Sequence, residues 1–148
     1  MTTSGVGSEP RHLNALGAIM VFSVVSTGVH FAHNFVMAED YPPVWPFFPN
    51  ALAYRVGIVV FWPLLTYLGI RAFRRYRAGK TRGVPSGLIA FGLAGAVSPL
   101  HFTGGVPQIP PFFMATIFTD ALSGLLLFGF AGWLVYSTRS AARRPAAA

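Results

Sequence analysis

The stretch SVVSTGVHFAHNFVM, residues 23–37, carries the most informative pattern in the chain. Its polar residues recur at steps of three and four positions: Ser23, Ser26, Thr27, His30, His33 and Asn34. On a helix, this spacing places all of them on one continuous face. Imidazole groups are costly in contact with lipid tails, so a membrane-spanning helix with this stripe is expected to turn it toward a buried polar site.

The apolar run around this stripe, residues 13–37, is long enough to cross a hydrocarbon layer of about 30 Å at about 1.5 Å per residue. Three further apolar runs follow at about 51–73, 84–103 and 112–137. The chain has 148 residues, of which 53% are hydrophobic and only 10% charged, whereas soluble domains average about a quarter charged residues. The sequence therefore predicts an all-α polytopic integral membrane protein with four transmembrane helices in a small bundle.

The chain contains no cysteine. This excludes disulfides, thiolate metal sites, iron–sulfur clusters and covalently attached c-type haem. Any metal site must therefore be built from nitrogen and oxygen ligands.

The net charge of +7 is concentrated in two short segments beside apolar spans. These basic residues are Arg71, Arg74, Arg75, Arg77, Lys80 and Arg82 in one connection, and Arg139, Arg143 and Arg144 near the C-terminus. Basic residues next to spans are typical of cytoplasmic loops, so the charge indicates topology and we expect no nucleic acid partner. We assign three segments to the cytoplasm: the N-terminus (1–12), the basic connection and the basic tail (138–148). The tail is expected to be disordered. The localisation expected is a multi-pass protein of the cell membrane, with the lipid bilayer as its immediate partner.

With this orientation, the ionisable residues within the spans all fall in the outer half of the bilayer. They are His30, His33, Arg55, His101 and Asp120. Spans one and three run outward and reach their histidines late, whereas spans two and four run inward and reach Arg55 and Asp120 early. This agreement in depth predicts one polar site shared by several helices.

The preferred hypothesis is a transition-metal site formed by His30, His33, His101 and Asp120. Histidines three positions apart share a helix face, and imidazole with carboxylate suits zinc, copper or iron. Asn34 is expected beside the cofactor, and Asn34, Thr116 and Ser123 are candidates to orient the ligands through hydrogen bonds. Such a site would serve redox chemistry, hydrolytic chemistry or metal handling.

Three alternatives stay open, and with them the question of whether the protein is an enzyme. A b-type haem could be held between a histidine of the first span and His101, with Arg55 pairing a propionate. A metal-free membrane enzyme or carrier could use Asp120 with His30 for acid–base chemistry on a lipophilic substrate, and Arg55 to hold an anionic group. In an accessory subunit of a larger membrane complex or a homo-oligomer, Asp120 and Arg55 would form a structural ion pair.

Overall fold

The computed structural model describes residues 10, 12–43 and 46–143, and this part of the chain is all helical. The order is α1 (Leu13–Val36), η1 (Ala38–Asp40), α2 (Ala51–Arg77), α3 (Val84–Ala96), η2 (Ser98–Phe102) and α4 (Pro111–Ala142). Within the described residues, four helical stretches are long and apolar enough to cross a membrane: Leu13–Val36, Ala51–Arg77, Val84–Phe102 and Pro111–Ala142. The prediction of four apolar helices is therefore confirmed.

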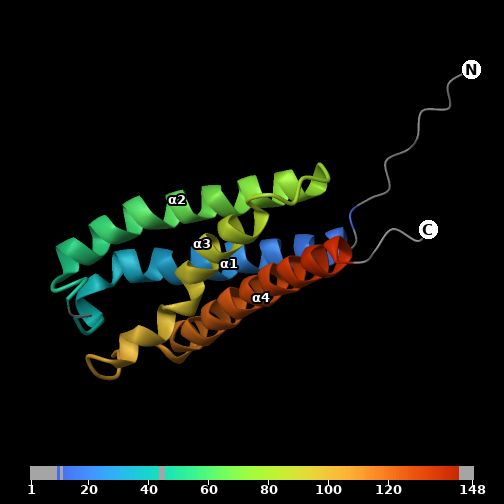
Figure 1. Cartoon of the computed structure of the whole chain (residues 1–148). Coiled ribbons are helices and arrows are strands. Elements are labelled where there is room, and N and C mark those ends of the chain that lie inside the picture. Colours follow the sequence, from blue (N-terminus) through green and yellow to red (C-terminus); the bar gives the residue numbers. More distant parts are fainter. Residues whose placement is uncertain (1–9, 11, 44–45, 144–148) are drawn as a thin grey trace, which may run out of the picture.

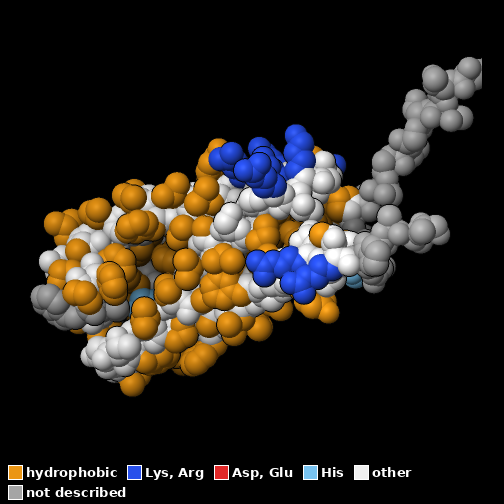
Figure 2. All heavy atoms as spheres, in the orientation of Figure 1, with side chains coloured by type: hydrophobic (Ala, Val, Ile, Leu, Met, Phe, Trp, Pro, Cys, Tyr) orange, Lys and Arg blue, Asp and Glu red, His pale blue; other side chains and the backbone are white. Residues whose placement is uncertain are grey.

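The helices run alternately in opposite directions, as Figure 1 shows. The α1–α2 and α3–α4 connections lie at one end of the bundle, and the α2–α3 connection lies at the other end, beside the start of α1 and the end of α4. We call these the connection end and the basic end. The Lys and Arg side chains visible in Figure 2 gather toward the basic end.

Local sequence explains where several of these helices begin and end. The Asn50 side chain accepts a hydrogen bond from the Ala53 backbone N–H and so caps the start of α2. Gly83 precedes α3 with φ of 76°, a left-handed conformation that glycine adopts without strain. The third span changes from α to 3-10 helix before His101, because Pro99 cannot donate a backbone hydrogen bond in the last turn.

Helices α3 and α4 pack with their backbones in close approach. A Cβ atom on Gly124 would meet the backbone O of Gly92 and the backbone of Ala96, and one on Gly95 would meet the carbonyl O of Asp120. Only residues without a side chain permit such an approach between two helices. The glycines thus bring the His101 segment, which follows α3, against the first half of α4.

The polar stripe of α1 faces the interior as predicted: all six of its members are buried. Ser26 Oγ lies 2.9 Å from Thr119 Oγ1 of α4, and the indole N–H of Trp62 in α2 donates to Thr27 Oγ1 over 3.1 Å. The stripe therefore contacts both neighbouring helices. Nearer the basic end, the interior is apolar and includes Leu16, Leu88 and Phe91.

The structure corrects two boundaries. The second helix continues beyond residue 73 to Arg77, and α4 continues through Ala142, so residues 138–142, expected to be disordered, are helical. Both extensions carry basic side chains near a helix C-terminus, where the helix dipole favours positive charge. Residues 1–9, 11 and 144–148 of the predicted cytoplasmic termini lie outside the described residues.

Candidate functional site

His30 of α1 and His101 of η2 meet inside the bundle. Their Nε2 atoms are 3.2 Å apart, and both imidazoles are buried. Asn34 lies one helical turn after His30, and its Nδ2 atom is 3.0 Å from His30 Nε2 and 3.3 Å from His101 Nε2. The first and third spans therefore meet at these polar side chains.

Tyr54 of α2 adds a third helix to this centre. Its hydroxyl lies 3.0 Å from His101 Nε2 and is buried in the bundle. A neutral imidazole nitrogen has a single lone pair or a single proton, yet three polar groups approach His101 Nε2 within 3.3 Å. We call His30, Asn34, Tyr54 and His101 the His–Asn–Tyr centre.

Thr116 of α4 determines the tautomer of His30. The Thr116 hydroxyl donates to the Phe113 carbonyl over 2.7 Å, and its oxygen is 3.0 Å from His30 Nδ1. Because the hydroxyl has one proton, His30 Nδ1 must carry a proton and donate to Thr116. The lone pair of His30 is therefore on Nε2, directed at the centre, and the sequence-based expectation that Thr116 orients a site histidine agrees with this contact.

Some polar atoms of the centre are buried with no hydrogen-bond partner among the described residues. They are Asn34 Oδ1 and His101 Nδ1. A half-turn of the Asn34 amide exchanges Oδ1 with Nδ2 and directs the oxygen at both Nε2 atoms. Buried polar atoms are nearly always hydrogen-bonded, so these two atoms have hydrogen-bonding capacity that no described side chain uses.

A small cavity of about 70 Å³ lies beside the centre. His30, Tyr54, His101 and Ser98 contribute to its wall together with apolar side chains, among them Phe48. Phe48 and Tyr54 also line a second cavity, of about 250 Å³, beneath the α1–α2 connection. These two aromatic side chains therefore lie in the wall of both cavities. A histidine is visible in a hollow near this end in Figure 2.

His33, expected as a metal ligand, is held away from the centre. Its Nδ1 is 2.8 Å from the Tyr41 hydroxyl, and its ring stacks on Phe113 with ring centres 3.6 Å apart. Burial raises the pKa of Tyr41, which keeps this phenol protonated. The His33–Tyr41 pair thus forms a separate contact at the end of α1, although the Tyr41 ring lies 4.8 Å from the ring of His101.

Asp120, also expected as a ligand, is paired with a hydroxyl. Ser98 Oγ donates to Asp120 Oδ2 over 2.7 Å, whereas Oδ1 is buried without a hydrogen-bond partner in the described part of the chain. The expected ligand set is therefore not assembled: among the described residues, no group of three or more His, Asp and Glu side chains lies close enough to hold a metal ion. The reason is register, because Thr116, one turn before Asp120, is the α4 residue that contacts His30.

Arg55 does not pair with Asp120, which corrects the structural ion pair considered from the sequence. Its Nη2 lies 3.0 Å from Glu39 Oε2, and its Nε donates to the Phe35 carbonyl over 3.0 Å. The guanidinium lowers the pKa of Glu39, chiefly through this hydrogen bond. Arg55 thus links α2 to the end of α1 and to the residues that follow it. Among the described residues, no hydrogen bond or ion pair joins the Arg55 side chain to the His–Asn–Tyr centre, so no contact supports its expected role beside an anionic cofactor.

Two contributors were missed in the sequence. Tyr54 precedes Arg55, the charged residue considered from the sequence. Tyr54 lies on the buried face of α2 together with Gly57 and Ile58. That spacing of three and four positions was the available signal. Tyr41 lies in a proline-rich connection without periodicity, and no sequence pattern indicates its contact with His33.

Comparisons of this chain with models of known protein families, with curated proteins and with solved structures gave no match.

Proposed function

We propose that the chain is an integral membrane protein whose four helices cross the bilayer, with the basic end in the cytoplasm. Large apolar side chains such as Val21, Val59 and Leu125 are more than half exposed on the outside of the bundle, which suits contact with lipid. The basic residues of the α2–α3 connection and of the end of α4 supply the positive-inside signal. In this orientation, the His–Asn–Tyr centre belongs to the outer half of the membrane.

We further propose that the His–Asn–Tyr centre binds one transition-metal ion, with His30 Nε2 and His101 Nε2 as its nitrogen ligands. The observation that carries this proposal is the spacing of the polar atoms, which are 3.0–3.3 Å apart. Ligands about 2.1 Å from one ion are separated by about 3.4 Å in a tetrahedron and by about 3.0 Å at right angles. The spacing therefore suits groups that share an ion.

Asn34 and Tyr54 complete the proposed ligand set. After a half-turn of the amide, Asn34 Oδ1 takes the position now held by Nδ2, and its missing hydrogen-bond partner becomes the ion. Tyr54 contributes its hydroxyl oxygen. Two imidazoles with oxygen ligands suit zinc, copper or iron. Asp120 and His33 are not in this set, which revises the set expected from the sequence.

The geometry favours a bare ion over haem. Axial histidines on opposite faces of haem each approach the iron to about 2.0 Å, which separates their nitrogen atoms by about 4 Å with the porphyrin plane between them. Here the two Nε2 atoms are 3.2 Å apart, and the adjoining cavity has a volume of about 70 Å³. That cavity suits a small molecule beside the ion, so the proposed chemistry is metal handling, or redox or hydrolytic chemistry on a small substrate.

Elemental analysis of the detergent-purified protein tests this proposal. We expect about one zinc, copper or iron ion per chain in the wild type, and its loss in both His30→Ala and His101→Ala. His33→Ala is the matched control, because it removes an imidazole from the same helix outside the centre. Retention of the metal in His30→Ala and His101→Ala, or its equal loss in all three variants, contradicts the proposed ligand set.

A metal-free role in proton transfer or in catalysis is the second candidate, and Asp120 favours it. Its buried Oδ1 atom has no hydrogen-bond partner among the described residues, and its partner Ser98 lines the same cavity as His30 and His101. A carboxyl group and an imidazole pair near one cavity could act on a lipophilic substrate. Wild-type protein without metal or chromophore after gentle purification, combined with loss of function in Asp120→Asn, would support this candidate.

A further inference from the structure

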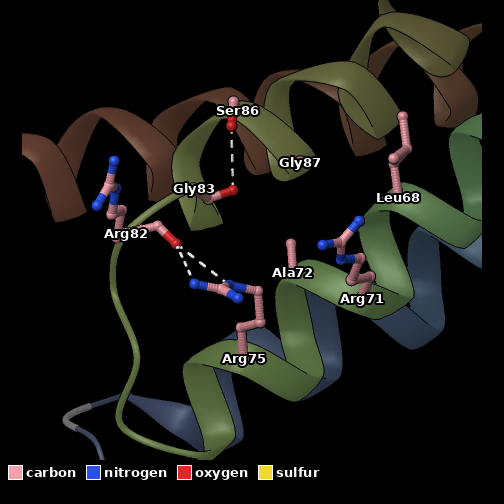
Figure 3. A pocket seen from close by; sticks show the side chains of 8 residues that line it. All are labelled: Leu68, Arg71, Ala72, Arg75, Arg82, Gly83, Ser86 and Gly87. Atoms are coloured by element: carbon pink, nitrogen blue, oxygen red, sulfur yellow. Dashed lines mark hydrogen bonds between the residues drawn. The ribbon is translucent and has the colours of Figure 1, made fainter.

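A second polar site lies at the basic end, far along α2 from the His–Asn–Tyr centre. It is a groove of about 470 Å³ between α2 and α3, shown in Figure 3. Its lining residues are Leu68, Arg71, Ala72, Arg75, Arg82, Gly83, Ser86 and Gly87. We call it the arginine groove.

Two guanidinium groups enter the groove from the α2 side. Arg71 and Arg75 are one helical turn apart and both rise toward α3 in Figure 3. Arg75 is held in place by the Arg82 carbonyl, to which its Nε donates over 3.2 Å and its Nη2 over 2.9 Å. Arg71 has no hydrogen-bond or ion-pair partner within the described residues. Its donors are therefore available to a ligand.

No carboxylate neutralises this charge in the described part of the chain. The acidic residues described are Glu39, Asp40 and Asp120, in η1 and in the first half of α4. These elements lie toward the connection end in Figure 1. The arginine groove therefore carries an uncompensated positive charge, which favours an anionic ligand.

The opposite wall of the groove is the first turn of α3. This turn begins after Gly83, has no side-chain cap, and presents the Ser86 hydroxyl, which donates to the Gly83 carbonyl over 3.0 Å. Backbone N–H groups in the first turn of a helix favour an anion. In this turn the N–H groups of Val84 and Gly87 donate to the Thr81 and Gly83 carbonyls, and Pro85 has no N–H. The Ser86 N–H therefore adds one donor opposite the guanidinium groups of the other wall.

The position of the arginine groove along α2 points to a lipid headgroup. Arg71 follows Ala51, the first residue of α2, by 20 positions. At about 1.5 Å per residue this is about 30 Å, which equals the thickness of the hydrocarbon layer. If α2 enters the hydrocarbon near Ala51, the guanidinium of Arg71 lies at the phosphate level of the inner leaflet.

We propose that the arginine groove binds the phosphate group of an anionic phospholipid of the inner leaflet. Arg71 and Arg75 hold the phosphate oxygens, and the backbone N–H of Ser86 supplies one further donor. Leu68, also in the lining, precedes Arg71 by three positions and provides apolar contact on the hydrocarbon side. The inference rests on the proposed membrane orientation and is independent of metal binding.

Native mass spectrometry of the detergent-purified full chain tests the inference. The probe is dioleoyl phosphatidylglycerol, with dioleoyl phosphatidylcholine as the zwitterionic comparison. The test variant is Arg71→Gln/Arg75→Gln. The matched control is Arg74→Gln/Arg77→Gln, which removes the same charge from the same end of α2 but leaves the lining of the arginine groove intact.

We expect the test variant to raise the dissociation constant for phosphatidylglycerol at least about tenfold, and the control to raise it less than about threefold. Arg71→Gln alone should also weaken binding, and it leaves the Arg75 contact with the Arg82 carbonyl in place. Equal losses in both double variants would overturn the inference, because they would indicate charge attraction without a site. Full competition by an excess of inorganic phosphate would overturn the lipid assignment in favour of a free phosphate.

Metal content of the same samples separates this inference from the proposed function. Arg71→Gln/Arg75→Gln should leave the metal content unchanged, and His30→Ala should leave lipid binding unchanged. Either proposal can therefore fail without the other.

Discussion

His30 Nε2 and His101 Nε2 lie 3.2 Å apart, although 71 positions separate the two residues in the sequence. This contact is produced by two local features: the polar face of α1, which carries His30, and the change from α3 to η2 before His101. Tyr54 and Asn34 converge on the same point from α2 and α1. The contact therefore joins α1 to the end of the third span and brings α2 to the same place.

Tyr54→Phe should weaken metal binding while preserving the fold. The phenyl ring keeps the packing against Phe48, but the oxygen at 3.0 Å from His101 Nε2 is lost. Removing a group that only supports a metal ligand costs about 10–100-fold in affinity. Because Tyr54 is itself a proposed ligand, we expect its loss to lower the metal affinity at least about tenfold. Competition with a chromophoric chelator measures the change.

Tyr41→Phe is the control for Tyr54→Phe. It removes a buried phenol that bonds His33 outside the centre. We expect it to change the metal affinity less than about threefold. Equal effects of the two variants would show that the Tyr54 hydroxyl is not specifically involved.

Asp120→Asn should retain the metal, because Asp120 bonds Ser98 and not the histidines. The asparagine carbonyl can still accept the Ser98 hydrogen bond. Asp120→Leu leaves Ser98 Oγ without its acceptor, which we expect to cost about 1–3 kcal/mol of unfolding free energy. Elemental analysis and unfolding in mixed micelles measure the two effects. Loss of the metal in Asp120→Asn would instead return Asp120 to the ligand set.

The apolar spans and the polar face of α1 were predictable because both depend on local periodicity. A span needs about 20 apolar residues, and a helix face repeats every three to four positions. The contact between the first span and the His101 segment was also predictable, because His30 and His101 lie at similar depths along their own helices. These features require no knowledge of how the helices rotate against one another.

The partners of the individual side chains were not predictable because they depend on that rotation. Asp120 and Thr116 share one face of α4, but only Thr116 contacts His30. Arg55 is level with the centre, yet it reaches Glu39 in the α1–α2 connection. The depth of a residue along its helix does not show which of two residues one turn apart makes a contact. It also does not show which side of the helix faces the site.

The ion pair between Glu39 and Arg55 should make stability depend on acid pH. Arg55 lowers the pKa of Glu39 from its usual 4.5, so the pair stabilises the fold above this value, and its contribution is lost as the pH falls through the lowered pKa. Glu39→Gln should therefore lower the unfolding temperature at pH near 7 and have progressively less effect as the pH falls through the lowered pKa. Thermal unfolding of both proteins across this range measures the difference. A difference that persists at low pH would contradict the assignment to the carboxylate.

Gly124→Ala should destabilise the bundle, because its Cβ would meet the backbone of Gly92 and Ala96 on α3. Backbone atoms cannot move aside as a flexible side chain can, so we expect a loss of about 1–3 kcal/mol in unfolding free energy. Gly129→Ala makes the same change five positions later on α4, where a Cβ has no neighbour within 4 Å among the described residues. There the gain in helix propensity should leave stability unchanged or raise it by up to about 1 kcal/mol. Unfolding by titration with a denaturing detergent compares the two variants, and similar values for both would mean that the close approach of α3 and α4 at Gly124 does not limit stability.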